Sequence, residues 1–554
     1  MTFQVSDPPV PPRVRSLLCL ACLLLPWISP FASGPSSSVD PWLLSATCVA
    51  LVLAIQPPAR LNPVLVLALA LLAAWTAIRT GLSPESLALA AACLLILMAA
   101  GAAAGGSSRA SFIDAMAFAW LLAAAVSTAM ALCQYFGVEA SFAPWINSSS
   151  AGEAYANLRQ RNQFASLTAI GMASLLWLSP RKLGAWTAVL AMAWLAAGNA
   201  ATTSRTGLMQ MLVLGVLACA WPGPRRARAA LFGVGLTAYL VAALALPALL
   251  EALTGVAGNR LWERVAAVDA CSSRTVLWSN VLHLIAQHPW RGWGWGELDF
   301  AHFTTLHPGA RFCDILDNAH SLPLHLAVEL GVPAALIACV GLLWAALRAR
   351  PWSDADPVRQ MAWGVLAVIG LHSLLEYPLW YGPFQLAFGL CLGLLWGVKP
   401  GPPLRAAGAR ARMVSAGLAV TVVAACAYAT WDYRRVSQVY LPPESRTPAM
   451  RDDPLPQIRK SWLFRNQARF AELTITPLTL NNAAWTYETA RSLLHYSPEP
   501  RIIEKALESA LVLKREDELL MDLARFKAAF PEAYDKWSKD RGGRGSAPPG
   551  QPAT

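Results

Sequence analysis

Residues 86–103 read SLALAAACLLILMAAGAA, an uncharged run with the length and composition of a helix that crosses a lipid bilayer. Runs of this kind recur along the chain, which has 554 residues, of which 56% are hydrophobic and only 14% charged. A soluble protein would carry about a quarter charged residues. The sequence therefore predicts an all-α polytopic membrane protein with about 12–13 transmembrane helices.

The spans are placed by their apolar composition. The first is interrupted by Pro26 and Pro30, and we interpret it as a span and not as a removed signal peptide, because it lacks a convincing cleavage site. About thirteen runs approach spanning length, and they lie near residues 14–30, 41–56, 63–78, 86–103, 112–136, 162–178, 184–198, 207–221, 229–250, 319–347, 362–377, 379–397 and 413–431.

The basic residues indicate how the chain is oriented. The net charge of +11 falls in short clusters between apolar runs, which is typical of membrane topology and not of a protein that binds nucleic acid. If the N-terminus is cytoplasmic, most clusters fall on the cytoplasmic side, and the short loops on the opposite side hold only Arg79, Arg159, Arg161 and Arg205. We therefore expect the N-terminus inside, and the long loop 251–318 and the chain after residue 431 outside.

Three regions follow from this topology. Residues 1–431 form the transmembrane domain, interrupted by the long outer loop 251–318, and residues 432–541 form an external helical domain. In that external domain, apolar residues recur at helical spacing on both sides of Ser497-Pro498-Glu499-Pro500, which resembles a tetratricopeptide-like hairpin. Residues 542–554, rich in glycine, proline and alanine, are expected to be disordered.

Two cysteines stand apart from those in the apolar spans. Cys271 and Cys313 lie in the long outer loop, where an oxidising compartment would let them form a disulfide. A pair of free thiols is equally compatible with the sequence, because spacing alone does not fix the geometry that a disulfide needs.

The most informative polar stretch is Asp317-Asn318-Ala319-His320, where the long outer loop runs into a predicted membrane helix. Histidine titrates near neutral pH and can take a proton from a hydroxyl group. A histidine at a membrane face therefore suggests chemistry between a lipid-bound and a water-borne reactant. The alternative is a polar cluster that only caps the helix.

Four further polar clusters are expected on the same outer side. They begin at Asn157, Thr202, Cys271 and Glu376, and the first three contain arginine, which a positive-inside bias should exclude from this side. The guanidinium group makes bidentate, charge-assisted bonds with diphosphates and keeps its charge. Several arginines near one histidine at a membrane face therefore suggest a phosphate-bearing lipid, whereas a single arginine could simply extend to the interface.

Other residues of the outer loop have a structural interpretation. The run from Trp290 to Gly296 is typical of interfacial tryptophans that anchor a re-entrant turn, and its glycines permit tight turns whatever the function. Histidines whose sequence neighbours supply no converging charges are interpreted as structural, namely His283, His288, His302, His307 and His325.

In this order, the polar segments resemble those of the bacterial O-antigen ligase/polymerase superfamily. The shared portion consists of Ser204-Arg205-Thr206-Gly207, Arg274 with Trp278, His288-Pro289 through Gly292-Trp293-Gly294, and Asn318-Ala319-His320 through Glu329-Leu330-Gly331. The segments Gln160-Arg161-Asn162-Gln163 and Glu376-Tyr377-Pro378, with the helical tail, resemble the branch of protein O-oligosaccharyltransferases that glycosylate pilins and other exported proteins. The resemblance covers most of residues 150–540.

The resemblance implies a metal-independent glycosyltransferase without a cofactor, which uses an undecaprenyl-diphosphate-linked oligosaccharide at the periplasmic face of the bacterial inner membrane. By the same match His320 is the essential residue that activates the acceptor hydroxyl. Arginines Arg205 and Arg274 are implied to bind the diphosphate, and Arg161 is a third candidate from its cluster. Gln160 and Tyr377 are implied as supporting residues.

The residues around His320 suggest how the reaction would proceed. Asp317 or Asn318 is the expected orienting group, since Glu329 lies about two and a half helical turns away on spacing alone. The family often has the asparagine and histidine directly adjacent, whereas Ala319 separates them here. Because no carboxylate nucleophile is evident, we expect transfer with inversion at the anomeric carbon.

Alternatives remain open. An O-antigen ligase with a lipid A-core acceptor and an O-antigen polymerase share the donor chemistry, and the external helical tail favours a protein acceptor such as a pilin. A membrane transporter would place polar groups near mid-membrane, often in broken helices, whereas these lie on one face. A structural scaffold for envelope assembly would leave the arginine and histidine cluster without a role.

Overall fold

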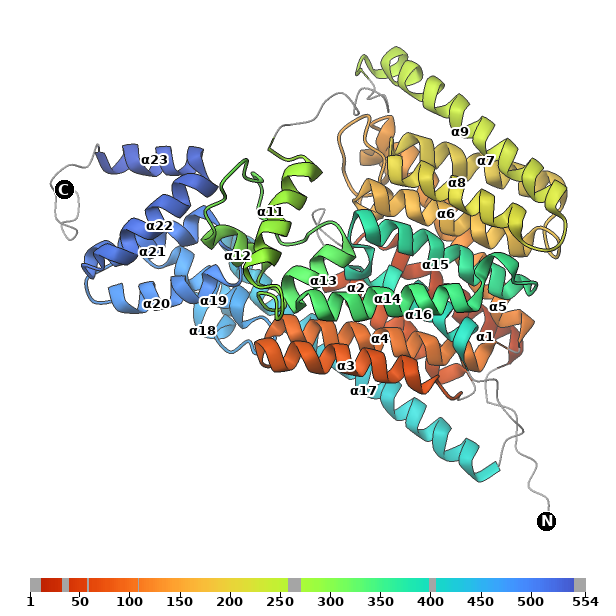
Figure 1. Ribbon diagram of the computed structural model, residues 1–554, viewed down its shortest axis with the longest axis horizontal. Helices are drawn as coiled ribbons and strands as arrows, with labels where there is room; N and C mark the ends of the chain where they lie inside the picture. Colours follow the sequence, from red (N-terminus) through yellow and green to blue (C-terminus); the bar gives the residue numbers. More distant parts are fainter. Residues whose placement is uncertain are drawn as a thin grey trace. The chain divides into compact units, whose positions relative to one another are not determined.

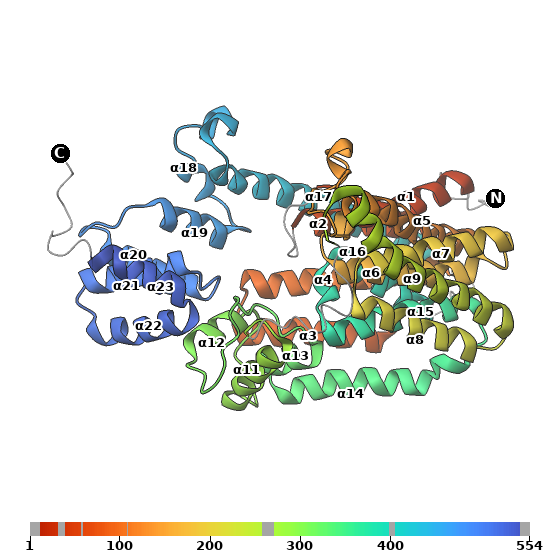
Figure 2. The same ribbon diagram turned by 90° about the horizontal axis from the view of Figure 1, so that it is seen from above.

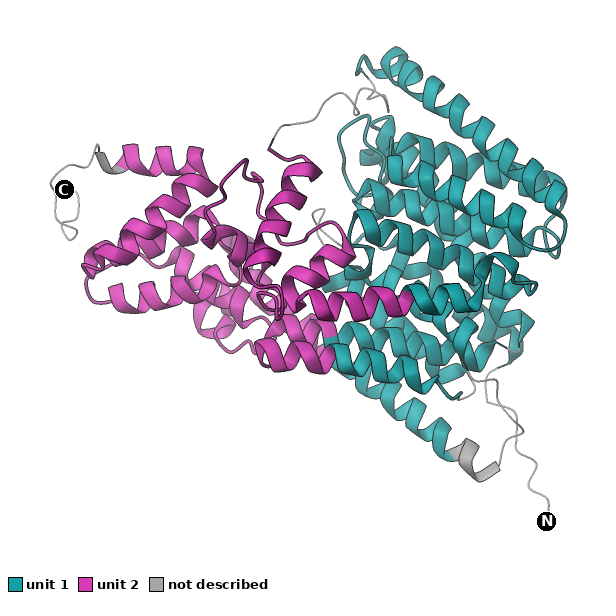
Figure 3. Ribbon diagram, viewed as in Figure 1, with its two compact units in different colours: residues 1–72, 90–267, 343–427 teal, residues 73–89, 268–342, 428–554 magenta. Residues whose placement is uncertain are grey.

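The computed structural model describes residues 11–31, 39–56, 59–107, 109–257, 271–397 and 405–542. The described chain is built from helices (Figure 1). It divides into two compact units, of which unit 1 comprises residues 1–72, 90–267 and 343–427, and unit 2 comprises residues 73–89, 268–342 and 428–554 (Figure 3). The C-terminal segment predicted to be disordered lies outside the described residues from position 543 onward.

Apolar helices dominate the first three quarters of the chain, and they confirm the predicted all-α polytopic membrane fold. Seven helical segments are long and apolar enough to cross a membrane: α3 (Pro63–Thr80), α4 (Pro84–Gly106), α5 (Ala110–Tyr135), α9 (Arg225–Thr254), Val332–Ser353, α15 (Pro357–Leu375) and Arg410–Tyr440. Shorter apolar helices are α2 (Val39–Ile55), α7 (Ala185–Ala201), α8 (Arg205–Ala220) and α16 (Gly382–Trp396). Two further predicted runs coincide with α1 (Pro12–Ile28) and α6 (Arg161–Leu178).

One predicted span is wrong, because it is not a single helix. The run near residues 319–347 is split into α13 (Leu322–Leu330) and α14 (Val332–Ala349) at Gly331, whose φ is +93°. Glycine adopts a positive φ without a steric penalty. A side chain at this position would also overlap the carbonyl group of Trp290. The chain therefore turns at Gly331 because another backbone segment passes directly beside it.

The core of unit 1 is a bundle of apolar helices. Helix α5 packs against α1, α6 and α7, while α15 packs against α6, α8 and α16. Helix α16 approaches α4 closely, because Gly389 and Gly393 face its backbone: a Cβ atom at Gly389 would lie 2.5 Å from the carbonyl oxygen of Ile96, and one at Gly393 would overlap Ala100. Small residues at such a contact let helix backbones approach, which is how helices associate in lipid.

Unit 2 combines the outer loop with the C-terminal helices. Helices α11 (Arg274–Gln287), α12 (Leu298–Thr304) and α13 lie close together (Figure 2). Side chains from all three form one buried core. The C-terminal helices are α18 (Leu455–Ile458), α19 (Arg465–Ile475), α20 (Ala483–Leu494), α21 (Pro500–Val512), α22 (Glu516–Ala529) and α23 (Pro531–Gly542). Phe303 of α12 is buried in the same cluster as Phe470, Leu493 and Phe526, so the tail helices pack on the outer loop.

The remaining helices complete the connections. The long α17 (Arg405–Ser437) leads into the tail. Short 3-10 helices are η1 (Glu139–Phe142), η2 (Ala156–Leu158), η3 (Pro351–Ser353), η4 (Pro378–Trp380), η5 (Gln438–Tyr440), η6 (Pro443–Ser445) and η7 (Pro448–Met450). The first two lie just before α6, and η4 lies just before α16, so irregular backbone surrounds the polar clusters of unit 1.

Candidate active site

His320 lies in unit 2, in the last turn before α13, and its backbone is held in a strained conformation. Its φ is +48°, a region that residues other than glycine adopt rarely and often at functional sites. The N–H of His320 donates to Oδ1 of Asn318 at 2.8 Å, and the indole N–H of Trp278 donates to the carbonyl of Ala319 at 3.1 Å. Asn318 and Trp278 therefore fix the backbone immediately before the half-buried histidine.

The carboxyl group of Asp317 interacts with the histidines of this segment. Although the residue as a whole is exposed, its carboxyl group lies among protein atoms, and this desolvation raises the pKa of Asp317. The charges of His320 and His325 oppose that increase. Asn318 thus acts on the backbone of His320, whereas Asp317 is within electrostatic range of its ring.

His325 has a charged neighbour, so the interpretation that nothing converges on it is wrong. Its Nε2 lies 3.3 Å from Oε2 of Glu329, and both side chains are buried in α13. The sequence already indicated this pair, because residues four apart on a helix lie on the same face. The same carboxylate oxygen accepts a hydrogen bond from the N–H of Gly296 at 3.1 Å. Glu329 therefore joins α13 to the Trp/Gly run.

The Trp/Gly run forms a platform for α13. The N–H groups of Trp293 and Gly294 donate to the carbonyls of Val328 and Glu329, at 2.9 and 3.0 Å. Gly292, with a φ of +65°, lies so close that a Cβ atom would overlap the backbone of Glu329. Glycine is needed at Gly292 because two backbone segments meet there. This reason is more specific than the tight turn expected from the sequence.

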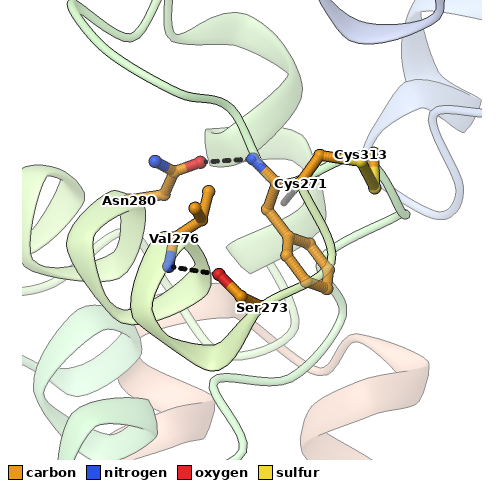
Figure 4. The surroundings of a disulfide bond; sticks show 6 residues. Cys271, Ser273, Val276, Asn280 and Cys313 are labelled. Carbon is orange, nitrogen blue, oxygen red and sulfur yellow. Dashed lines mark hydrogen bonds between the residues drawn. A yellow bond between two sulfur atoms is a disulfide. The ribbon is translucent and has the colours of Figure 1, made fainter. Parts of the chain in front are cut away.

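Arg274 begins α11, close in sequence to a disulfide. Ser273 caps the helix by accepting the N–H of Val276 at 3.3 Å. Cys271 and Cys313 form the disulfide, with Cα atoms 5.4 Å apart (Figure 4). Beside it, Oδ1 of Asn280 accepts the N–H of Phe312 at 2.9 Å. These contacts tie the start of α11 to the segment that leads to His320.

Asp299 of α12 is an acidic residue with a strongly shifted pKa. Burial, together with the neighbouring carboxylates Glu297, Glu329 and Asp317, raises its pKa well above the usual range. A hydrogen bond from the N–H of Phe300, at 2.7 Å, partly offsets this effect. The outer loop therefore concentrates acidic side chains beside the histidines.

In unit 1, a polar network joins the starts of α6 and α8 to the end of α15. Nδ2 of Asn162 donates to Oε1 of Glu376 at 3.1 Å, and the hydroxyl of Ser204 donates to Oδ1 of Asn162 at 2.6 Å. Ser204 also caps α8, which places Arg205 at its first position with an exposed side chain. Gln160 caps α6 by accepting the N–H of Gln163 at 2.8 Å. Gln160 and Arg205, two of the predicted site residues, thus lie at the N-terminal ends of α6 and α8.

The arginines of the first cluster have different surroundings. Arg161 pairs with Glu153 at 3.3 Å. Arg159 has a φ of +58°, and its Nε and Nη1 are buried and have no hydrogen-bond partner among the described residues. Burial lowers the pKa of Arg159, an effect that nearby Tyr381 opposes. Tyr381 in turn stacks on Tyr377, with ring centroids 6.1 Å apart.

The structure therefore groups the predicted residues within each unit. His320, Asn318, Asp317 and Arg274 belong to unit 2, and the remaining candidates belong to unit 1: Gln160, Arg161, Arg205 and Tyr377. The sequence placed Arg159 in the same cluster as Arg161 but gave no reason to assign it a role of its own. Its distinctive feature, a guanidinium without a partner among the described residues, is visible only in three dimensions.

Comparison with known proteins gives matches over these same segments. A family model described as O-Antigen ligase matches residues 190–339, which include Arg205, Arg274 and His320. A model of the C-terminal part of virulence factor membrane-bound polymerases matches residues 360–542, and one described as protein glycosylation ligase matches residues 154–178.

A curated relative matches as well. The general O-oligosaccharyltransferase of Acinetobacter baylyi is 24% identical over 291 residues, which are 50% of this chain and 50% of the relative. The match thus spans about half the length of that relative. Together with the three family models, it shows that this membrane protein is similar to O-antigen ligases and O-oligosaccharyltransferases.

Proposed function

We propose that this protein transfers an oligosaccharide en bloc from undecaprenyl diphosphate to serine or threonine hydroxyls of exported proteins such as pilins. The observation that carries the proposal is His320, held at a positive φ by Asn318 and Trp278 in the segment that a disulfide ties to Arg274. The match to a protein glycosylation ligase model and the A. baylyi relative support the activity.

The chemistry follows from charge and proton balance. The acceptor oxygen forms a bond to the anomeric carbon, the bond from that carbon to the diphosphate breaks, and His320 takes the hydroxyl proton. Asp317 stabilises the imidazolium that results. Arg205, Arg274 and Arg161 bind the negative charge that grows on the leaving diphosphate, and such fixed donors lower the barrier. One displacement step without a carboxylate nucleophile inverts the anomeric centre.

The surroundings of the reaction are proposed from the topology of the chain. The protein lies in the bacterial inner membrane with its N-terminus in the cytoplasm, and the active site and C-terminal helices face the periplasm. The Cys271–Cys313 disulfide supports this orientation, because disulfides persist in the periplasm and are rare in the cytosol.

Two classes of acceptor have support from the comparisons. Transfer to lipid A-core or polymerisation of O-antigen is the second candidate, favoured by the O-Antigen ligase and polymerase models. A protein acceptor is favoured by the match at residues 154–178 and by the tail helices, whose buried core includes Phe303 of the outer loop.

The test is a transfer assay in cells that contain a lipid-linked oligosaccharide, a pilin-type acceptor and a lipid A-core acceptor. His320→Ala should abolish glycan transfer to the pilin, because a positioned general base contributes roughly 10²–10⁴-fold. His283→Ala, the same change elsewhere in the outer loop, is the matched control, and membrane levels of all variants are compared. Glycan on lipid A-core alone would make the protein a ligase, and transfer that survives His320→Ala would refute the mechanism.

A further inference from the structure

A cavity in unit 2 is not used by the proposed transfer step. It has a volume of about 270 Å³ and is lined by three segments: the turn between α3 and α4, the Trp/Gly run with the start of α12, and the residue after α20. Its principal side chains are Arg79, Glu85, Trp295, Glu297, Phe300 and His495. The volume is near the lower end of small-molecule sites, which hold roughly 300–1,000 Å³.

One wall of the cavity is built from the tail. The imidazole of His495 stacks on the ring of Phe300 with centroids 3.6 Å apart, and its Nδ1 lies 2.6 Å from Oε2 of Glu297. Trp295 lines the same cavity and packs edge-on against His325 at 5.5 Å. The rings of His495 and Phe300 therefore hold each other in place, and Trp295 contacts the helix that follows His320.

The lining also carries a polar atom without a partner among the described residues, Nε of Arg79. This atom is buried, and Arg79 and Glu85 form no ion pair in the described part of the chain. A buried polar atom of this kind normally has a partner. Arg79 was also one of the few arginines expected on the outer side, where the proposed transfer step gives it no role.

The chemistry of the lining identifies a class of ligand. The lining holds one arginine and two carboxylates, Glu85 and Glu297, and Glu297 is paired with His495, so the cavity does not suit a diphosphate or another strong anion. Flat aromatic rings pack against the C–H faces of pyranose rings, while carboxylates and a guanidinium bind sugar hydroxyls. A polypeptide segment would instead require a longer, less polar groove.

We infer that this cavity binds one sugar of the donor oligosaccharide, other than the sugar attached to the diphosphate. The inference rests on the proposed function, because it assigns a subsite to the same lipid-linked donor. It also gives the tail a second role, since His495 brings the C-terminal helices into contact with the glycan.

The experiment compares donors that differ in glycan length. Full-length protein in detergent is assayed with a polyprenyl-diphosphate trisaccharide and with the matched monosaccharide. Arg79→Gln and Glu85→Gln should raise KM for the trisaccharide about tenfold, equivalent to about 1.4 kcal/mol, with kcat unchanged. Both variants should match wild type with the monosaccharide donor, which also shows that they are folded. Glu488→Gln, which removes a carboxylate whose side chain is 71% exposed, is the control.

A second measurement separates this inference from the proposed function. Binding of the free trisaccharide, followed by saturation-transfer NMR, should be lost in Arg79→Gln and Glu85→Gln and retained in His320→Ala. An unchanged KM and an unchanged NMR signal in the cavity variants would overturn the sugar site. A raised KM for the acceptor peptide alone would show that the cavity binds polypeptide. Wild-type protein that binds the trisaccharide and transfers nothing would refute the function and leave the sugar site intact.

Discussion

At the scale of single residues, two side chains fix the backbone of the candidate catalytic histidine. Asn318 accepts the N–H of the Ala319–His320 peptide and Trp278 donates to its carbonyl, so both polar groups of this peptide are bound by side chains of the protein. Preorganised groups cost no reorganisation when charge develops during a reaction. The strain of a positive φ at His320 is offset by these two hydrogen bonds.

Arg159 should contribute more to donor binding than Arg161. Arg159 has guanidinium atoms without a partner among the described residues, whereas Arg161 already pairs with Glu153. A hydrogen bond to a charged group contributes about 1.5–3 kcal/mol. Arg159→Gln is therefore expected to raise KM for the lipid-linked donor by about 10–100-fold, and Arg161→Gln by much less. Equal effects in a steady-state transfer assay would contradict this ranking.

Asp299 should make the protein less stable as the pH rises. Its pKa is raised in the folded state, so the folded protein binds more protons than the unfolded chain between about pH 4 and that raised pKa. Stability falls with rising pH across this window. Asp299→Asn keeps an acceptor for the N–H of Phe300 and should raise the thermal unfolding midpoint at about pH 8 by a few degrees. The difference should vanish near pH 4; a variant less stable than wild type at about pH 8 would show that the charge is stabilising.

At the scale of helices, the apolar runs predicted most boundaries because bilayer thickness fixes the length of a span. The predicted run 86–103 became α4 (Pro84–Gly106), and 162–178 became α6 (Arg161–Leu178). The break at Gly331 could not be predicted in this way, since the run remains apolar on both sides. It depends on the Trp/Gly run that passes beside it, which is distant in sequence.

The candidate site was predictable to a similar degree. The clusters that contain His320, Arg274 and Arg205 stand out because polar residues are costly at a membrane face. The pairing of His325 with Glu329 was also present in the sequence as an i, i+4 spacing. The difference between Arg159 and Arg161 could not be predicted from the sequence, because it depends on which side chains surround each guanidinium after folding.

The disulfide should stabilise the outer loop measurably. It joins residues 42 positions apart, and a crosslink of this kind typically contributes about 2–4 kcal/mol. The double change Cys271→Ser and Cys313→Ser is expected to lower the unfolding midpoint in detergent, and reductant should then have no further effect. Cys219→Ser, a free cysteine in α8, is the control. A midpoint unchanged by the double substitution would mean that the hydrogen bonds of Asn280 and the apolar core stabilise the outer loop without the disulfide.

At the scale of the whole molecule, segments far apart in the sequence build one unit. Unit 2 unites the turn between α3 and α4, the outer loop and the C-terminal helices. Phe303 of the loop is buried with Phe470, Leu493 and Phe526 of the tail, and Arg525 donates to the carbonyl of Thr304 at 2.9 Å. Hydropathy could not predict this association, because the segments are separated by membrane helices in the sequence.

In the proposed topology, every part of unit 2 that lies outside the bilayer is on the periplasmic side. Alkaline phosphatase fused after Tyr440 or within the loop near Gly309 should be active, because it is active only in the periplasm. Fluorescent protein fused at Pro224 or Pro351, beside basic clusters, should fluoresce in the cytoplasm. Active phosphatase at Pro224 would invert the topology and with it the location of the active site.

The contact of α16 with α4 also sets an order of events during synthesis. Helix α4 leaves the ribosome early, whereas Gly389 and Gly393, the residues that fit against its backbone near Ile96 and Ala100, are made only after the outer loop and α15. Through that interval the face of α4 at Ile96 and Ala100 is not yet covered by α16. The bundle is therefore completed late: under the proposed topology, the outer loop is exported before α16 has packed against α4.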